Sequence, residues 1–194
     1  MKNILFLIAV FMCSTAPGQS WTKQYDHVNE PCCGLAKVRK DNKYGFVNSK
    51  GKVIIPLIYD EVLSFSEGNA AVSRGGKWGF VDSTGKETIP LEYYDALSFT
   101  EGVALIAKGD RYGFIDKSGR PVISADYTNA RSFAEGVAPV SNQKNQWGYI
   151  DKSGKEVIAF QFQYADSFIN GQARVMKAGK WFVIDRNGTI VGGE

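Results

Sequence analysis

The sequence repeats itself about every 34 residues, and this repetition limits the folds open to the chain more than any other feature. Residues 77–90 read KWGFVDSTGKETIP, and residues 111–124 read RYGFIDKSGRPVIS. An aromatic–glycine step recurs at Tyr44-Gly45, Trp78-Gly79, Tyr112-Gly113 and Trp147-Gly148, with Trp181-Phe182 in the fifth place. Glycines recur in the same register at Gly34, Gly68, Gly102, Gly136 and Gly171. Tracks that share one register predict a tandem array of five similar units.

Each unit has the pattern of short strands joined by tight turns. In the segment EGVALIAKGD, Ala104 and Ile106 are two residues apart, which places both on one face of a strand. Residues that tolerate a left-handed backbone follow, and then the strand KWGFVD or its equivalent. Asp82 and Gly85 match a bulged hairpin loop, after which a third strand ends at Pro90. A connection such as EYYDALSFTEG leads to the next unit.

This reading predicts an all-β fold in a single repeat domain of residues 19–194. The expected architecture is a tandem array of five three-stranded antiparallel meanders in an open, β-solenoid-like arrangement, because the two ends of the array differ in sequence. The alternative is a small closed propeller with five blades. The expected units cover residues 25–58, 59–92, 93–126, 127–161 and 162–194.

The aromatic–glycine step is predicted to hold neighbouring units together. A three-stranded unit is not stable alone, so it needs a bulky side chain packed against its neighbour. The glycine beside that side chain lets another backbone or ring approach closely. The predicted structural anchors are Tyr44, Gly45, Trp78, Gly79, Tyr112, Gly113, Trp147, Gly148 and Trp181.

The first 18 residues have the pattern of a secretory signal peptide. Lys2 precedes an apolar run at residues 4–13, and small residues follow before an expected cleavage ahead of Gln19. The run is too short to span a membrane as a helix. The mature protein is therefore expected to be secreted or periplasmic, without a transmembrane segment. In the alternative, Cys13 is acylated and anchors the chain through lipid.

Two adjacent cysteines, Cys32 and Cys33, remain after such a cleavage. Their Cα atoms are closer than in most disulfides, so we weigh three states: free buried thiols, an intermolecular bond or a strained vicinal bond. Only His27 could join them as a further metal ligand, which argues against a zinc site.

These motifs resemble the WG-repeat family, also called KWG repeats, which is widespread in bacteria. The resemblance covers residues 25–192 and is closest at residues 77–82 and in the Phe-x-Glu-Gly motifs at Phe99 and Phe133. The chain departs from the family pattern at Phe182, at Asn170 and at Cys32-Cys33. The resemblance implies a β-rich repeat module, often attached to exported proteins, and implies no reaction and no agreed ligand.

No catalytic or cofactor-binding residues are predicted. The chain has one histidine, and no nucleophile, phosphate-loop or metal-ligand motif occurs. The aspartates at Asp82, Asp116, Asp151 and Asp185 recur in every unit, so we interpret them as turn residues rather than calcium ligands. The net charge is only +3 and its cations are scattered, which argues against a nucleic-acid partner.

The predicted function is a protein-interaction scaffold that is not an enzyme, with an unknown protein partner. The alternative is a module that binds glycans or the cell wall through exposed rings. Tyr94, Phe160 and Tyr164 lie off the main repeat register and are the possible ligand-facing aromatics, although they could instead fill gaps between units.

Overall fold

A computed structural model describes residues 20–193, and these form an all-β array behind one short 3-10 helix, η1 (Ser20–Gln24). The strands make five separate antiparallel sheets, each in the order of the sequence. We number the units 1 to 5 by these sheets. Unit 1 holds β1 (His27–Val28), β2 (Leu35–Lys40), β3 (Lys43–Asn48) and β4 (Val53–Tyr59); unit 2 holds β5 (Glu61–Val62), β6 (Asn69–Arg74), β7 (Lys77–Asp82) and β8 (Glu87–Tyr93); unit 3 holds β9 (Asp95–Ala96), β10 (Val103–Lys108), β11 (Arg111–Asp116) and β12 (Pro121–Tyr127); unit 4 holds β13 (Asn129–Ala130), β14 (Val137–Ser141), β15 (Trp147–Asp151) and β16 (Glu156–Phe162); unit 5 holds β17 (Tyr164–Ala165), β18 (Gln172–Lys177), β19 (Lys180–Asp185) and β20 (Ile190–Gly193).

Each sheet has four strands, so the prediction of three-stranded meanders was incomplete. The additional strand lies in the segment interpreted as a connection, and it is only two residues long. In unit 3 it pairs Asp95 with Ala107 and Ala96 with Ile106. Two residues cannot show an alternating pattern, which explains why the sequence did not reveal this strand. Each sheet begins two residues after the corresponding predicted unit, at residues 27, 61, 95, 129 and 164.

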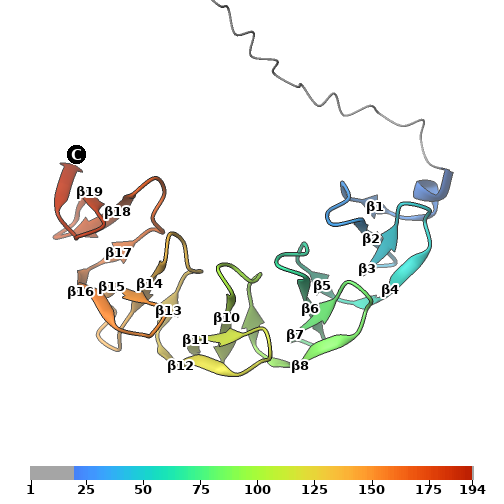
Figure 1. The fold of residues 1–194 in the computed structure, drawn as a ribbon, viewed down its shortest axis with the longest axis horizontal. Helices are drawn as coiled ribbons and strands as arrows, with labels where there is room; N and C mark the ends of the chain where they lie inside the picture. The colour runs from blue at the N-terminus through green and yellow to red at the C-terminus, as the bar shows by residue number, and fades with distance from the viewer. Residues whose placement is uncertain (1–19, 194) are drawn as a thin grey trace, which may run out of the picture.

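The five sheets stand side by side like blades and form an open arc (Figure 1). Units 1 and 5 lie at the two tips of the arc, so the alternative of a closed five-bladed propeller is not formed. The long fourth strands, such as β8 and β12, run along the outer edge of the arc, and the two-residue strands form the opposite, inner edge of each sheet. The stack of sheets curves instead of continuing straight like a solenoid (Figure 1).

The core lies between successive sheets. One cluster, for example, packs Ala71, Phe80 and Ile89 of unit 2 against Ala104 and Ile115 of unit 3. We call the face of a sheet that is turned to the next unit its forward face, and the opposite one its back face. In the middle units both faces of the second strand are covered, and β6 and β10 are buried along five of their six residues.

The predicted signal peptide, residues 1–18, and the alternative lipid site Cys13 lie outside the described residues. None of the helices within residues 20–193 is long and apolar enough to cross a membrane.

Candidate functional site

The forward faces of units 1 to 4 share one row of three side chains across the second, third and fourth strands. The row is Lys37–Phe46–Ile55 in unit 1, Ala71–Phe80–Ile89 in unit 2, Leu105–Phe114–Ile123 in unit 3 and Pro139–Tyr149–Ile158 in unit 4. The central ring is at most 2% exposed in all four units. Each central ring lies 4.8 to 5.0 Å, centroid to centroid, from a phenylalanine of the following unit: Phe65, Phe99, Phe133 or Phe168.

Unit 5 departs from this row at its second and third positions, and at the first position it carries a cation, as unit 1 does with Lys37. Its forward face carries Arg174, Val183 and Gly192 where the other units carry a covered row with a central ring and an isoleucine. Within the described residues no further unit covers this face, and Trp181 lies on the same side of the sheet. We call this surface, formed by Gln172, Arg174, Trp181, Val183 and Gly192, the end face.

The smaller side chains leave the end face hollowed. A cavity of about 400 Å³ lies against Arg131, Ile169, Gln172, Arg174 and Val183. A second cavity of about 230 Å³ is lined by Arg174, Trp181, Phe182, Val183 and Gly193. Arg174 and Val183 border both hollows, so the two form one surface with the guanidinium of Arg174 between them. Volumes of this size suit a few side chains of a partner better than a large cofactor.

An arginine–aromatic cluster supports the larger hollow from the side of unit 4. Arg131 stands where units 2 and 3 have Leu63 and Leu97, and it donates hydrogen bonds from Nη2 to the hydroxyl of Tyr164 and from Nε to the carbonyl of Ala165 at 3.1 Å. Its Nη2 atom also lies 3.8 Å from the carboxylate of Asp166. The charge of Arg131 is therefore already compensated within the chain.

Arg174 has no such compensation. Its guanidinium lies 4.7 Å from the ring centroid of Trp181, in a cation–π contact. Between residues 20 and 193 its side chain makes neither an ion pair nor a hydrogen bond, and the residue is exposed. The end face thus presents an arginine without an ion pair, bordering two hollows that are partly apolar.

Tyr149 lies fully buried in the junction between units 4 and 5. It replaces the phenylalanine of the other units, and its hydroxyl donates a hydrogen bond of 2.8 Å to the carbonyl of Asp166. Burial raises the pKa of Tyr149 well above its ordinary value, so the phenol stays neutral. The hydrogen bond fixes the backbone that carries Asp166 at the edge of the hollow.

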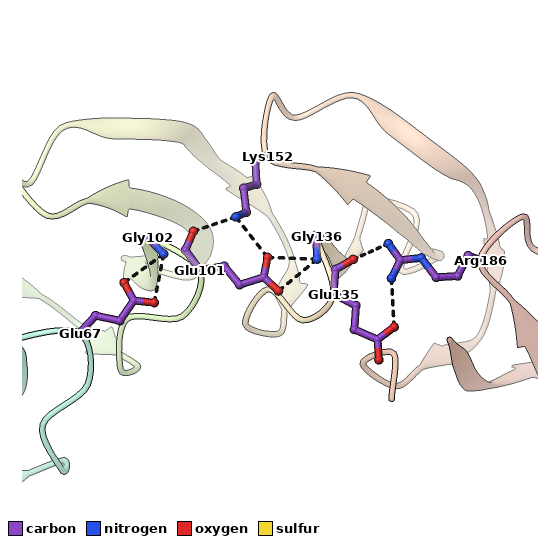
Figure 2. Close-up of polar contacts among 7 residues, drawn as sticks. All are labelled: Glu67, Glu101, Gly102, Glu135, Gly136, Lys152 and Arg186. Carbon is purple, nitrogen blue, oxygen red and sulfur yellow. Dashed lines mark hydrogen bonds and ion pairs between the residues drawn. The ribbon is translucent and has the colours of Figure 1, made fainter. Parts of the chain in front are cut away.

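A row of glutamates, which we call the glutamate ladder, connects successive units (Figure 2). The carboxylates of Glu67, Glu101 and Glu135 accept hydrogen bonds from the amides of Gly102, Gly136 and Gly171 in the next unit, at 3.0 to 3.3 Å. Each also pairs with a cation of that next unit: Lys117 at 3.1 Å, Lys152 at 3.2 Å or Arg186 at 3.0 Å. In unit 5 the position holds Asn170, which has no carboxylate to offer.

The carboxylate of Glu67 shows what the ladder does to its members. Burial alone would raise its pKa, but the hydrogen bonds from Lys117 and from the amide of Gly102 lower it overall. Glu67, Glu101 and Glu135 adopt positive φ angles of 50 to 53°, which cost energy for a residue other than glycine. Cys33 and Asn170 have a similar positive φ in units 1 and 5, so this conformation belongs to the turn that all five units share.

At the other end of the arc, the N-terminal segment covers the back face of unit 1. Trp21 and Tyr25 pack against the cluster of Ala36, Val38 and Val47. A Cβ atom on Gly51 would lie 2.4 Å from the ring of Trp21, whereas the equivalent Gly119 meets Ile89 of the preceding unit. Trp21 therefore takes the place that an isoleucine of a preceding unit would fill. The end face, in contrast, is covered by no segment of residues 20–193.

The predicted aromatic anchors are in most units less enclosed than the rings two residues later, although Tyr44, Trp78 and Tyr112 pack against the clusters at the junctions. Trp147 is 7% exposed, whereas Tyr44, Trp78, Tyr112 and Trp181 are only half-buried. The rings fully enclosed between units stand two residues later, as in Phe80. The glycines of the step, Gly45, Gly79, Gly113 and Gly148, are buried, and a Cβ there would lie 2.5 to 2.8 Å from the backbone of the fourth strand.

Phe182, which breaks the aromatic–glycine step, has a structural explanation. In units 1 to 4 the fourth strand bulges over the glycine, with register shifts on both sides of the third strand's phenylalanine or tyrosine. In unit 5 Phe182 pairs directly with Gly193 and the pairing shifts once, between Val183 and Ile184. In unit 5 the glycine of this pair is therefore Gly193, on the fourth strand, instead of a residue of the third strand.

The three possible ligand-facing aromatics are in different environments. Tyr94 is 61% exposed, and Lys77 lies 3.5 Å from its ring centroid. Phe160 is half-buried and stacks on Tyr127, with centroids 6.4 Å apart. Tyr164 is half-buried between Trp147 at 5.9 Å and Trp181 at 5.5 Å. The structure thus brings only Tyr164 next to the end face.

Cys32 and Cys33 lie exposed in the first turn of unit 1, at the positions of Ser66 and Glu67. Their Sγ atoms are 3.3 Å apart and both are free. The hydrogen bond with Cys33 is the main reason why the pKa of Cys32 is raised. Of the three states considered from the sequence, the thiols are free but not buried. No group of three metal-ligating side chains occurs within residues 20–193.

The recurring aspartates all serve their own hairpin turns. Oδ1 of Asp82 accepts hydrogen bonds from the amides of Thr84 at 2.8 Å and Lys86 at 3.1 Å, and Asp116 and Asp151 repeat this arrangement. In unit 1 Asn48 makes the equivalent contacts with Lys50 and Lys52. These carboxylates are therefore occupied by backbone donors.

Of the residues of the end face, the sequence predicted a role for Trp181 but none for Gln172, Arg174, Val183 and Gly192. Arg174 and Val183 depart from the repeat where units 2 to 4 have Ala71, Leu105 or Pro139 and an aromatic ring, and Gly192 replaces an isoleucine. Residues that recur identify the repeat, whereas residues that deviate from it, such as these, mark the surface at which unit 5 differs from the other units.

Comparison with solved structures shows a shared type of fold. The computationally designed protein Ika8 is 13% identical with a TM-score of 0.56, over 86% of this chain and 60% of that chain. Hsv2 of Kluyveromyces lactis is 13% identical with a TM-score of 0.54, over 82% and 59%. BamB from Moraxella catarrhalis is 14% identical with a TM-score of 0.50, over 83% and 58%. The chain spans about three fifths of the length of these proteins, and such low identities show likeness of fold alone.

Sequence comparison identifies the repeat itself. No curated protein matches the chain. The family model described as WG containing repeat matches residues 44–78, 78–112, 112–145 and 147–181, in the register of the aromatic–glycine step. The matched residues cover most of the chain, and the protein therefore belongs to the family of WG containing repeats.

Proposed function

We propose that this protein is an exported, non-enzymatic scaffold that binds another protein. The uncovered end face of unit 5 carries this proposal. Every other junction of the array is closed by a ring from the following unit, whereas Arg174, Val183 and Gly192 leave a hollowed, partly apolar surface. Repeat arrays commonly use extended surfaces of this kind for protein recognition.

The distribution of polar residues supports a binding role over a catalytic one. The recurring aspartates hold turns, and the glutamates of the ladder hold neighbouring units together. Arg131 is engaged by Tyr164 and Asp166. Ser167 and Asp166 both line the larger hollow, but no hydrogen bond joins their side chains within residues 20–193, whereas an acyl-transfer or hydrolytic site needs its nucleophile bonded to its base.

Site-specific cross-linking in the organism of origin tests the scaffold proposal. A photoreactive amino acid is placed in the full chain at Val183 on the end face, at Ser98 after the inner strand of unit 3, or at Lys86 on a turn as the control. We expect one envelope protein to be cross-linked from Val183 or Ser98 and not from Lys86. The absence of any protein cross-link from the first two positions would contradict the proposal.

A glycan-binding function is the second candidate, and one observation favours it. Tyr94 presents a largely exposed ring, the kind of surface on which a sugar can stack, although Lys77 lies against it. Sedimentation of the purified chain with bare cell-wall sacculi, lost in Tyr94→Ala, would establish this function in place of the scaffold.

Cell fractionation tests export. Recovery of the chain from the periplasm or medium with Gln19 at its N-terminus would support export, and retention of residues 1–18 would contradict it.

A further inference from the structure

We propose that the end face binds a partner segment in which an aromatic side chain lies next to a carboxylate. This inference rests on the proposed scaffold function and names the chemistry of the partner. It is drawn from three features of the end face: the shape of its hollows, its unpaired arginine, and its differences from the faces that receive another repeat unit.

The shape indicates a missing ring. In units 1 to 4 the central position of the row is a phenylalanine or tyrosine, and it packs on a phenylalanine of the next unit. Val183 and Gly192 are smaller than the residues that they replace. Cavities of about 400 and 230 Å³ both border Val183, and the smaller one extends to Gly193, next to Gly192. A partner that closes this surface must bring the apolar volume that the chain itself lacks, and a phenyl or indole group supplies it in one side chain.

The charge indicates an acid beside that ring. Arg174 lies between the two hollows, with the ring of Trp181 under its guanidinium and no acidic partner within residues 20–193. Covering an unpaired guanidinium with apolar groups would be unfavourable, since a buried charge needs a partner. A carboxylate offers two oxygens that match the guanidinium fork, so an acidic side chain is the complementary group.

The same features argue against a second copy of this chain as the occupant. The back face of a repeat unit offers Ala70, Val72 and Val81, with no carboxylate for Arg174. In unit 1 the back face is already covered by Trp21. A different protein segment fits the end face better than another unit of this array.

Peptide titrations followed by NMR test the proposal on the full chain. The probe is an eight-residue peptide with two Glu–Phe pairs, and the matched peptides carry Lys–Phe or Glu–Ala pairs. We expect the Glu–Phe peptide to shift the indole N–H signal of Trp181 and the methyl signals of Val183, and to bind at least about tenfold more tightly than the other two. Equal binding of the Glu–Phe and Lys–Phe peptides would overturn the proposal.

Two variants separate the charge from the hollow. Arg174→Glu should lose the Glu–Phe peptide and gain the Lys–Phe peptide, whereas Lys108→Glu, which makes the same charge change on β10, should bind as wild type does. Val183→Phe restores the side chain of the other units and fills the hollow, so it should block the Glu–Phe peptide while the chain remains folded by circular dichroism. Unchanged binding by Val183→Phe would place the ligand elsewhere and reject the end face.

The photo-cross-linking experiment tests the scaffold function separately from the end-face proposal. If photo-cross-linking captures a partner through Ser98 but not through Val183, the scaffold stands and the end-face proposal fails. If neither position captures a protein and no peptide binds, both fail.

Discussion

The ring of Phe80 in unit 2 lies 4.8 Å, centroid to centroid, from the ring of Phe99 in unit 3, and both side chains are completely buried. The contact recurs at all four junctions, so it is the main apolar link between units. We predict that Phe80→Ala lowers the free energy of unfolding by about 3–5 kcal/mol, because it removes a large buried side chain and leaves a cavity. Replacing the half-buried Trp78 with alanine should lower the free energy of unfolding by only about 1–2 kcal/mol. Urea unfolding followed by circular dichroism measures both free energies. If Trp78→Ala and Phe80→Ala were equally destabilised, Trp78 would stabilise the junction as much as Phe80 does.

Gly79 gives a second prediction about packing. A Cβ at this position would lie 2.6 Å from the carbonyl oxygens of Ile89 and Pro90, in the strand that bulges over the glycine. We expect Gly79→Ala to destabilise the protein by about 1–3 kcal/mol or more, because the backbone of β8 must move. Gly192→Ala is the control, since its Cβ would meet only Val183 at 3.7 Å. The unfolding midpoint of Gly192→Ala should match wild type, and a Gly79→Ala variant as stable as this control would contradict the prediction.

The glutamate ladder should contribute a small, salt-dependent coupling between units. Glu101 and Lys152 lie 3.2 Å apart, with side chains 30% and 45% exposed. A double-mutant cycle of Glu101→Gln and Lys152→Met should give a coupling of about 0.2–1 kcal/mol. The coupling should shrink as salt is added, because exposed charges are screened. Lys155→Met, at a neighbouring exposed lysine, should show no coupling to Glu101. A coupling that is unchanged at high salt would mean that the contact is not electrostatic.

The sequence was sufficient to predict the repeat architecture, because spacing and alternation record strands and turns directly. Tyr44, Trp78, Tyr112 and Trp147 fix the register, and the family match uses the same positions. The two-residue strands such as β9 could not be predicted, since their pairing depends on where the chain turns in space. The curvature of the arc likewise depends on how whole sheets pack against one another.

The candidate site could be predicted only in part. Tyr164 was selected because it lies off the repeat register, and it does lie beside the end face. Arg174 and Val183 were not selected, because a strand residue looks ordinary until its neighbours across the sheet are known. What makes Arg174 unusual is that the equivalent positions in units 2 to 4 are apolar and covered, and that its own face is open.

Asp116 provides a prediction about pH. Hydrogen bonds, the largest from the hydroxyl of Ser118, outweigh the opposing effect of burial and lower the pKa of this carboxylate to about 2. In the unfolded chain its pKa is about 3.9, so its contribution to stability is present above about pH 4 and is lost as the pH falls towards 2. Asp116→Asn should keep the turn, as Asn48 does in unit 1, but remove this titration. Thermal unfolding should therefore depend less steeply on pH in Asp116→Asn than in wild type across this window, whereas Asp126→Asn, at an exposed carboxylate outside the turns, should follow wild type. Identical slopes for Asp116→Asn and wild type would show that the turn does not stabilise the ionised aspartate.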